Sequence, residues 1–197
     1  LAKADDGELF LEYRQSESVV FDDGQVKSAA FDTAQGFGLR AIAGEATGYS
    51  HSSELSEDAI RRAGETVKAV QQGHAGNWAD GPVGTNRTLY GDDNPLSVLD
   101  FETKVNLLAE IDAYARAKDT SVKQVSVSLN GQWQAIQIIR PDGERMGDIR
   151  PLVRLNVSIV VEKGGRMETG NFGTGGREVY DRFIEPDSWR GAVDEAL

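Results

Sequence analysis

Apolar and polar residues alternate along much of this chain, and the alternation predicts β-strands. In residues 151–161 every second side chain is apolar, which places one set on a single face of an extended strand: Val153, Leu155, Val157, Ile159 and Val161. Residues 122–133 alternate in a similar way, and residues 8–21 and 25–33 are rich in β-forming side chains. We therefore expect strands that bury one face.

Glycine-containing pairs divide these segments at regular intervals. Asp-Gly, Asn-Gly and Gly-Gly favour the tight turns of β-hairpins, because glycine accepts a left-handed backbone without steric cost. Each half of the chain is therefore expected to hold four strands. We expect the breaks between them at Asp23-Gly24, Gly36, Gly44, Asn130-Gly131, Asp142-Gly143 and Gly164-Gly165.

Two segments between the strands have helical spacing. The first follows Ser56, a good N-cap, and Glu57 and Asp58 complement the dipole of its first turn. The second begins near Ser97 and carries apolar side chains on one side. These side chains are Phe101, Val105, Leu108 and Ala115.

A third helix is expected at the end of the sequence. Pro186 and Asp187 suit its first turn, and apolar residues then recur at Trp189, Val193 and Leu197. No glycine or basic residue marks its end. We therefore expect residues 186–197 to be the start of a helix that leads into a further domain.

The order of these elements predicts an α+β fold. Two successive antiparallel, meander-like strand blocks would have their helices packed on one face. The second half repeats the pattern of the first without a residue-level repeat, which indicates a pseudo-duplication. We expect one domain over 1–185, with halves 1–72 and 96–185 joined by a glycine-rich loop, 73–95.

Composition narrows the possible functions. The chain has 197 residues and a net charge of −11, and this charge disfavours contact with nucleic acid or anionic membranes. It has no cysteine, so disulfides and thiolate chemistry are excluded. No apolar run approaches the ~20 residues that span a bilayer, and the first residues lack the apolar core of a signal peptide. We expect a cytoplasmic protein.

Catalytic and metal-binding patterns are missing from the sequence. The two histidines, His51 and His74, belong to no ligand-spaced cluster. Each is better interpreted as an ordinary polar residue than as a catalytic one. The carboxylate pairs Asp22/Asp23 and Asp92/Asp93 suit turns better than acid–base catalysis. We predict no catalytic residue and no metal ligand in this chain.

The segment GNFGTGGREVY concentrates glycines before an arginine. A phosphate-binding loop is disfavoured, because the lysine of a Walker motif is absent and no clear helix start follows. The glycines instead indicate a left-handed backbone or a close approach to another segment. Arg177 would then be a fixed cation suited to a carboxylate partner. We single out Gly173, Gly175, Gly176 and Arg177 as a candidate junction that also lines a substrate channel.

Six sequence blocks resemble one known family, in the family's order, and together they cover nearly the whole chain. The chain resembles the N-terminal part of TldD-type subunits of the TldD/PmbA (TldE) family, zinc metallopeptidases formerly labelled modulators of DNA gyrase. The blocks are GELFLEYRQSESVVFDDGQVKSAAFDTAQGFGLRAI, LYGDDNPL, DAYARAKD, QVSVSLNGQWQAIQI, DIRPLVRLNVSIV and GTGGR.

The resemblance implies a function for a longer protein. In the family, a catalytic domain with a His-Glu-x-x-x-His motif and a cysteine ligand holds zinc, and the Gly-Gly-Arg block lies shortly before it. Neither element occurs in these 197 residues, so no ligand or general base can be assigned here. The resemblance further implies cleavage of unfolded or flexible peptides and pairing with a PmbA/TldE-like paralogue. The net charge gives little support to the gyrase label.

Three functions remain open at this point. The chain could be the non-catalytic N-terminal domain of a zinc peptidase, shaping its substrate chamber and subunit interface. It could be a stand-alone peptide-binding module that adds a β-strand to an exposed sheet edge. It could also be a small enzyme, although no nucleophile–base pair or metal cluster supports that reading.

Overall fold

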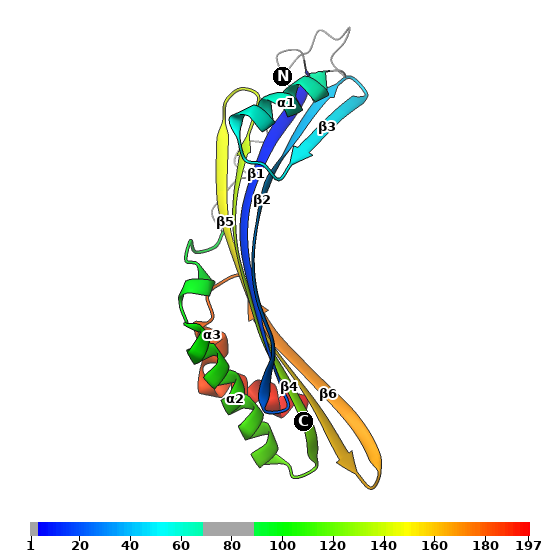
Figure 1. The fold of residues 1–197 in the computed structure, drawn as a ribbon, viewed down its shortest axis with the longest axis vertical. Coiled ribbons are helices and arrows are strands. Elements are labelled where there is room, and N and C mark those ends of the chain that lie inside the picture. Colours follow the sequence, from blue (N-terminus) through cyan, green and yellow to red (C-terminus); the bar gives the residue numbers. More distant parts are fainter. Residues whose placement is uncertain (1–3, 69–88) are drawn as a thin grey trace. The chain divides into compact units, whose positions relative to one another are not determined.

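A computed structural model describes residues 4–68 and 89–197 of the chain (Figure 1). Most of the loop predicted over 73–95, with His74 and Trp78, lies outside the described residues. The strands of the described part are β1 (Asp6–Asp22), β2 (Gln25–Ala43), β3 (Ala46–Ser52), β4 (Val122–Ile139), β5 (Arg145–Lys163) and β6 (Arg166–Gly176). The helices are α1 (Glu57–Val67), the short 3-10 turn η2 (Pro95–Ser97), α2 (Phe101–Lys118), α3 (Asp181–Ile184) and α4 (Pro186–Ala196).

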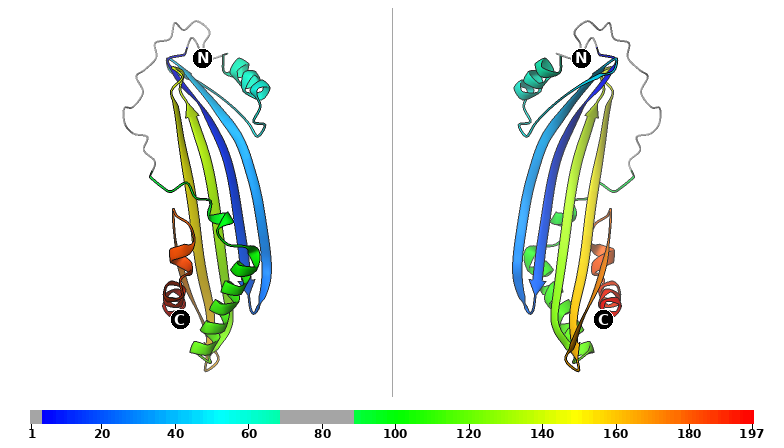
Figure 2. Two further views of the ribbon diagram at one scale, coloured as in Figure 1. Left: turned by 90° about the vertical axis from the view of Figure 1, so that its left-hand side faces the viewer. Right: turned by 90° about the vertical axis from the view of Figure 1, so that its right-hand side faces the viewer.

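The strands form one antiparallel sheet in the order β3-β2-β1-β4-β5-β6. This order joins two three-stranded meanders through the neighbours β1 and β4, and the side views show β1, β2, β4 and β5 running side by side (Figure 2). The helices pack on one side of the strands. The predicted α+β fold with two antiparallel strand blocks is therefore confirmed.

Four of the six predicted breaks are turns. Asp23, Gly24, Gly44, Gly143 and the Gly164-Gly165 pair have the positive φ angles that such turns require. Gly36 and Asn130-Gly131 were expected to be breaks, and this prediction is wrong, because both sites lie inside continuous strands, β2 and β4. Each half of the chain therefore contributes three strands rather than four.

Close packing explains the glycines at the two wrong turn positions. A Cβ on Gly36 would lie 2.8 Å from the carbonyl oxygen of Ser52 on the neighbouring strand β3. A Cβ on Gly131 would lie 2.6 Å from Cδ2 of Leu96 and would also collide with the hydroxyl of Tyr180. Both glycines serve tertiary contacts that local sequence does not reveal.

The predicted helix starts are partly correct. Ser56 caps α1 by accepting a hydrogen bond from the Ala59 backbone at 3.1 Å, and α4 opens at Pro186 as expected. The helix expected near Ser97 starts later, because η2 comes first and Asp100 then caps α2. Phe101 is consequently the first residue of α2 and is 52% exposed, so it does not join the predicted apolar face.

The described residues divide into two compact units. Unit 1 comprises residues 4–14, 33–68, 89 and 134–149. Its core packs β2 against α1 through the buried residues Phe37, Leu39, Ala41, Ala59, Ala63 and Val67. Leu9 and Leu11 of β1 pack against this core from the neighbouring strand.

Unit 2 comprises residues 15–32, 90–133 and 150–197. Here β1, β4 and β5 bury alternate side chains against α2, α3 and α4, which gather beside the same stretch of strands (Figure 1). The predicted alternation is confirmed, since the buried strand residues include Val125, Val127, Leu129, Val153, Leu155, Val157 and Ile159. We call this the helix-covered face of unit 2, and the opposite side of the same strands its open face.

Candidate functional site

The glycines of the Gly-Gly-Arg segment lie at the end of β6, paired with β5. Gly173 is opposite Asn156, and Gly175 is opposite Arg154. A Cβ on Gly175 would lie 2.9 Å from the Cα of Arg154 and would collide with the Val153 carbonyl oxygen. A Cβ on Gly173 would lie 2.5 Å from a terminal nitrogen of Arg154.

The sequence offered two reasons for these glycines, a left-handed backbone or a close approach to another segment, and the contacts decide between them. Gly173, Gly175 and Gly176 are not among the glycines with positive φ. The role of Gly173 and Gly175 is therefore the close approach of β6 to β5 and its side chains, rather than a left-handed turn. A Cβ on Gly176 would instead lie 3.1 Å from the Phe183 ring and 3.1 Å from a carboxylate oxygen of Glu178. The structure brings the three glycines together along one strand end.

Arg177 directly follows β6, and its guanidinium carbon lies 5.4 Å from the centroid of the Tyr90 ring. Stacking of this kind is a favourable cation–π contact. The sequence led us to expect a carboxylate partner, but within the described part of the chain the recorded contact is aromatic.

A buried charged cluster lies under the same segment, on the helix-covered face. Lys104 of α2 is 1% exposed, and its Nζ lies 2.6 Å from Oε1 of Glu17 on β1. The same Nζ donates to the carbonyl of Leu96 at 3.2 Å and lies 5.8 Å from the centroid of the Tyr180 ring. Because an ion is costly to bury alone, loss of either partner would leave an uncompensated charge where β1, α2 and η2 meet.

Tyr180 completes this cluster three residues after Arg177. Its hydroxyl is fully buried and has no hydrogen-bond partner among the described residues. Burial raises the pKa of this hydroxyl, and the nearby Glu17 carboxylate raises it further, so the phenol stays neutral. The missing side chain of Gly131 makes room for it. The sequence analysis did not identify Lys104, Glu17 or Tyr180 as a group, because they are far apart along the chain.

A continuous row of hydrogen-bonded side chains crosses three strands on the open face of unit 2. Ser18 donates to Oδ1 of Asn130 at 2.8 Å, and Nδ2 of Asn130 donates to Oγ of Ser128 at 3.2 Å. Asn156 also donates to Ser128, at 3.1 Å, and Nε of Arg154 donates to Oδ1 of Asn156 at 2.6 Å. We call these five residues the polar row.

Hydrogen-bond chemistry fixes how the polar row is oriented. A guanidinium can only donate, so Asn156 must present its oxygen to Arg154 and its nitrogen to Ser128. Ser128 accepts two hydrogen bonds, which leaves its own O–H free to donate outward. Within residues 4–68 and 89–197, the terminal nitrogens of Arg154 have no hydrogen-bond acceptor either. At this end of the row, the groups that have no partner among the described residues are therefore mainly hydrogen-bond donors.

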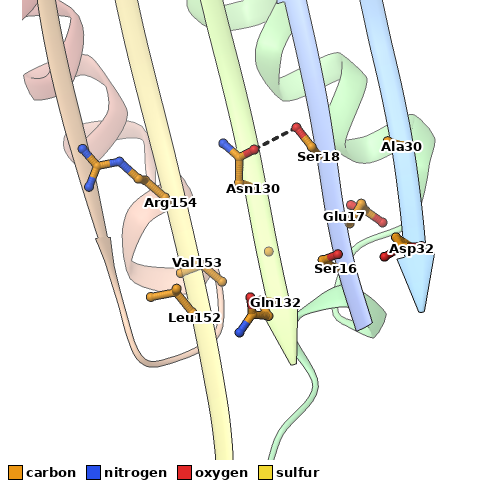
Figure 3. A pocket seen from close by; sticks show the side chains of 11 residues that line it. Ser16, Glu17, Ser18, Ala30, Asp32, Asn130, Gln132, Leu152, Val153 and Arg154 are labelled. Carbon is orange, nitrogen blue, oxygen red and sulfur yellow. Dashed lines mark hydrogen bonds between the residues drawn. The ribbon is translucent and has the colours of Figure 1, made fainter. Parts of the chain in front are cut away.

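The polar row borders two hollows in the open face. The first, of about 350 Å³, is the one in Figure 3, where Ser18 bonds to Asn130 and the Arg154 side chain reaches toward β6. Asp32 and Glu17 are among its lining residues. The second, which we call the β4–β6 hollow, has about 360 Å³. Its polar lining consists of Ser126, Ser128, Ser158, Asn156, Asn171 and Arg154.

The β4–β6 hollow contains one of the residues singled out from sequence. Gly173 forms part of its wall. Phe172 is also at this wall, but it lies opposite Val157 on β5, so its side chain points to the helix-covered face. None of the described residues that line it is acidic, in contrast to the hollow of Figure 3. The remaining members were missed because alternating Ser and Asn positions do not reveal which strands are neighbours.

Unit 1 has its own hollow, beside β3. Tyr49 and His51 stack there with ring centroids 5.7 Å apart, and both side chains are exposed. Gly38 leaves space for the Tyr49 ring, since a Cβ would lie 2.7 Å from its hydroxyl. His51 is thus an exposed residue near the end of β3 with an aromatic neighbour.

The described residues, 4–68 and 89–197, contain no cluster of metal-ligating side chains. No group of three His, Cys, Asp or Glu side chains is arranged there to hold a metal ion. A zinc peptidase site needs about three such ligands, so these residues do not fit one. In the same ranges no helix is long and apolar enough to cross a membrane.

Comparisons with known proteins agree with the sequence blocks. The model of the PmbA/TldA metallopeptidase domain 1 matches residues 7–70, and that of the central domain of the same family matches residues 94–197. A metalloprotease TldD homolog from Haemophilus influenzae is 37% identical over 185 residues, which are 92% of this chain and 38% of the relative. One from Buchnera aphidicola (Schizaphis graminum) is 34% identical, over 93% of this chain and 38% of the relative.

Solved structures share the fold at low sequence identity. TldE from Thermococcus kodakarensis aligns with a TM-score of 0.78 at 16% identity, over 98% of this chain and 43% of that one. A putative modulator of DNA gyrase from Bacteroides thetaiotaomicron aligns with a TM-score of 0.74 at 13% identity, over 100% of this chain and 46% of that one. The chain spans well under half the length of the curated relatives it matches, and corresponds to their N-terminal part. From these matches, the chain belongs to the PmbA/TldD family of metallopeptidases.

Proposed function

We propose that this chain is the non-catalytic N-terminal part of a TldD-like, zinc-dependent peptidase that degrades or processes unfolded or flexible peptides. In this role it contributes to the substrate chamber and to the subunit interface. One observation carries the proposal: the chain is 37% identical to a TldD-type metalloprotease over 92% of its own length, yet it spans only 38% of that relative.

Zinc would be held outside these residues. The chain has no cysteine, and its two histidines are 23 positions apart. The described residues offer no group of ligands for a metal. Under this proposal the chain's own contribution is to bind and orient peptide and to position the catalytic domain.

The same proposal assigns roles to individual segments, a partner and a cellular location. Residues 1–185 form the N-terminal domain, with halves 1–72 and 96–185, and residues 186–197 lead into the catalytic domain. The segment from Gly173 to Arg177 is a junction that borders the substrate route. The partner is a PmbA/TldE-like paralogue, and the protein acts in the cytoplasm.

The test compares residues 1–197 with the intact subunit, each with and without the paralogue. Zinc content is measured after a chelator wash, and cleavage is followed with a flexible peptide. We expect stoichiometric zinc in the intact subunit, cleavage only by the paired intact proteins, and neither in residues 1–197 alone. Chelator-sensitive cleavage by residues 1–197 alone would contradict the proposal.

A second candidate is a stand-alone module that binds peptides by β-strand addition. Its support is the position of β6 at one edge of the sheet, with most of its side chains exposed. Tight binding of an unfolded peptide by residues 1–197 alone, with no gain on adding the catalytic domain or the paralogue, would favour this alternative.

A further inference from the structure

We propose that the β4–β6 hollow is a binding site for a carboxylate group of the peptide substrate, with the guanidinium of Arg154 as its anchor. The inference rests on the proposed function, because it assigns a ligand to the face that would handle peptide. It concerns binding and orientation only and involves no chemical step.

Arg154 is held in one orientation by its neighbours on β5 and β6. Its Nε is occupied by Oδ1 of Asn156 at 2.6 Å, which fixes the plane of the guanidinium. Gly173 provides the space beside it, since a Cβ there would lie 2.5 Å from the Arg154 terminal nitrogen and 2.7 Å from the Asn156 oxygen. Its terminal N–H groups have no acceptor in the described part of the chain, and a guanidinium fork of this kind matches the two oxygens of a carboxylate.

No acidic side chain of the described residues neutralises the positive charge of Arg154. Other arginines of the chain pair with acids, such as Arg140 with Asp6 at 2.8 Å and Arg116 with Asp112 at 3.0 Å. For Arg154 no carboxylate lies within ion-pair distance among the described residues. Arg154 is thus a cation held in place by an amide, in a chain with 32 acidic and 21 basic residues.

The lining of the β4–β6 hollow also suits an anionic group. Hydroxyls and amides surround Arg154, and the described lining has no acidic side chain. Ser128 can donate its O–H outward because both of its recorded hydrogen bonds are accepted ones. These donors complement the lone pairs of an anionic oxygen group.

A carboxylate suits this site better than a phosphate. Arg154 is the single cation among the described lining residues, and one planar fork balances one negative charge. The carboxylate could be the C-terminus of a peptide or an Asp or Glu side chain, and the chemistry of recognition is shared. The experiment below separates these two sources.

The test measures binding of fluorescent peptides by anisotropy, using the intact subunit with its paralogue after zinc removal. Three flexible peptides are compared: one with a free C-terminus and no acidic side chain, one amidated with a single Glu, and one amidated with no acid. The variants are Arg154→Gln, Arg154→Lys and Gly173→Ala, with Arg61→Gln on α1 as the matched control. Inorganic phosphate and acetate serve as competitors.

We expect Arg154→Gln to weaken at least one carboxylate-bearing peptide by about tenfold or more, as for loss of a charged hydrogen-bonded pair. Gly173→Ala should act in the same direction, Arg154→Lys should keep part of the affinity, and Arg61→Gln should change nothing. The fully amidated, acid-free peptide should bind equally to all of them. Whichever carboxylate-bearing peptide responds identifies the source.

Several results would overturn the inference. These are unchanged binding in Arg154→Gln, an equal loss for the acid-free peptide, or competition by phosphate far stronger than by acetate. Loss of pairing with the paralogue in Arg154→Gln, measured by size-exclusion chromatography, would assign the hollow to the partner subunit instead. Failure of the proposed function would look different, because the wild-type pair would then cleave none of the peptides when zinc is present.

Discussion

The two faces of the unit 2 strands carry different kinds of residues on the same backbone. Along β5, Val153, Leu155, Val157 and Ile159 are at most 1% exposed on the helix-covered face. Between them, Arg154, Asn156 and Ser158 face the opposite side and line the β4–β6 hollow. Along this one strand, buried apolar side chains therefore alternate with side chains that form hydrogen bonds on the other face.

This difference indicates that one face of the strands stabilises the fold and the other binds ligand. Burial of each large apolar side chain stabilises the fold by about 1.5–3 kcal/mol, so substitutions on the helix-covered face should act on stability. The open-face side chains bury little and bond mainly to each other, so their loss should act on ligand binding.

The largest effect is expected for Val157→Asp. It would place a carboxylate at a position that is 1% exposed and surrounded by apolar side chains, so unit 2 should lose more than about 4 kcal/mol or fail to fold. Ser158→Asp, one residue along and on the open face, should change the free energy of unfolding by less than about 0.5 kcal/mol. Chemical denaturation of both variants checks this, and equal damage would show that the two faces are not distinct.

A smaller effect is expected for Gly175→Ala. Its Cβ would lie 2.9 Å from the Cα of Arg154 and would collide with the Val153 carbonyl, so β6 must shift, at a cost of about 1–3 kcal/mol. The matched control is Gly191→Ala in α4, where nothing lies within 4 Å of the new atom and helix propensity should stabilise by up to about 1 kcal/mol. Thermal unfolding compares them; similar shifts of the same sign would refute the close-approach explanation.

The helix-covered face was largely predictable from sequence, and the open face was not. Alternation fixed the buried positions of β5, because a half-buried strand has a period of two wherever it lies in a sheet. Asn130-Gly131 misled the prediction, since its glycine is required by Tyr180 and Leu96, which are remote in sequence. The local signal of a glycine is the same for a turn and for a close contact.

The candidate site was predicted only in part. The glycine density before Arg177 correctly indicated close approach, and Gly173 proved to line a hollow. The polar row could not be predicted, because Ser18, Asn130 and Asn156 are neighbours only through the pairing of β1, β4 and β5. Nor could the burial of Lys104, since a helical lysine is normally exposed.

The most direct test of these different roles of the two faces compares Lys104→Met with Arg154→Gln in the intact subunit paired with its paralogue. For each variant, the free energy of unfolding and the affinity for a carboxylate-bearing peptide are measured together. Lys104→Met should cost about 3–5 kcal/mol of stability, because Glu17 loses its buried partner, while the folded protein still binds peptide. Arg154→Gln should keep its stability within about 0.5 kcal/mol and lose the peptide. If Arg154→Gln unfolds as readily as Lys104→Met, or if folded Lys104→Met loses the peptide while Arg154→Gln retains it, the account is contradicted.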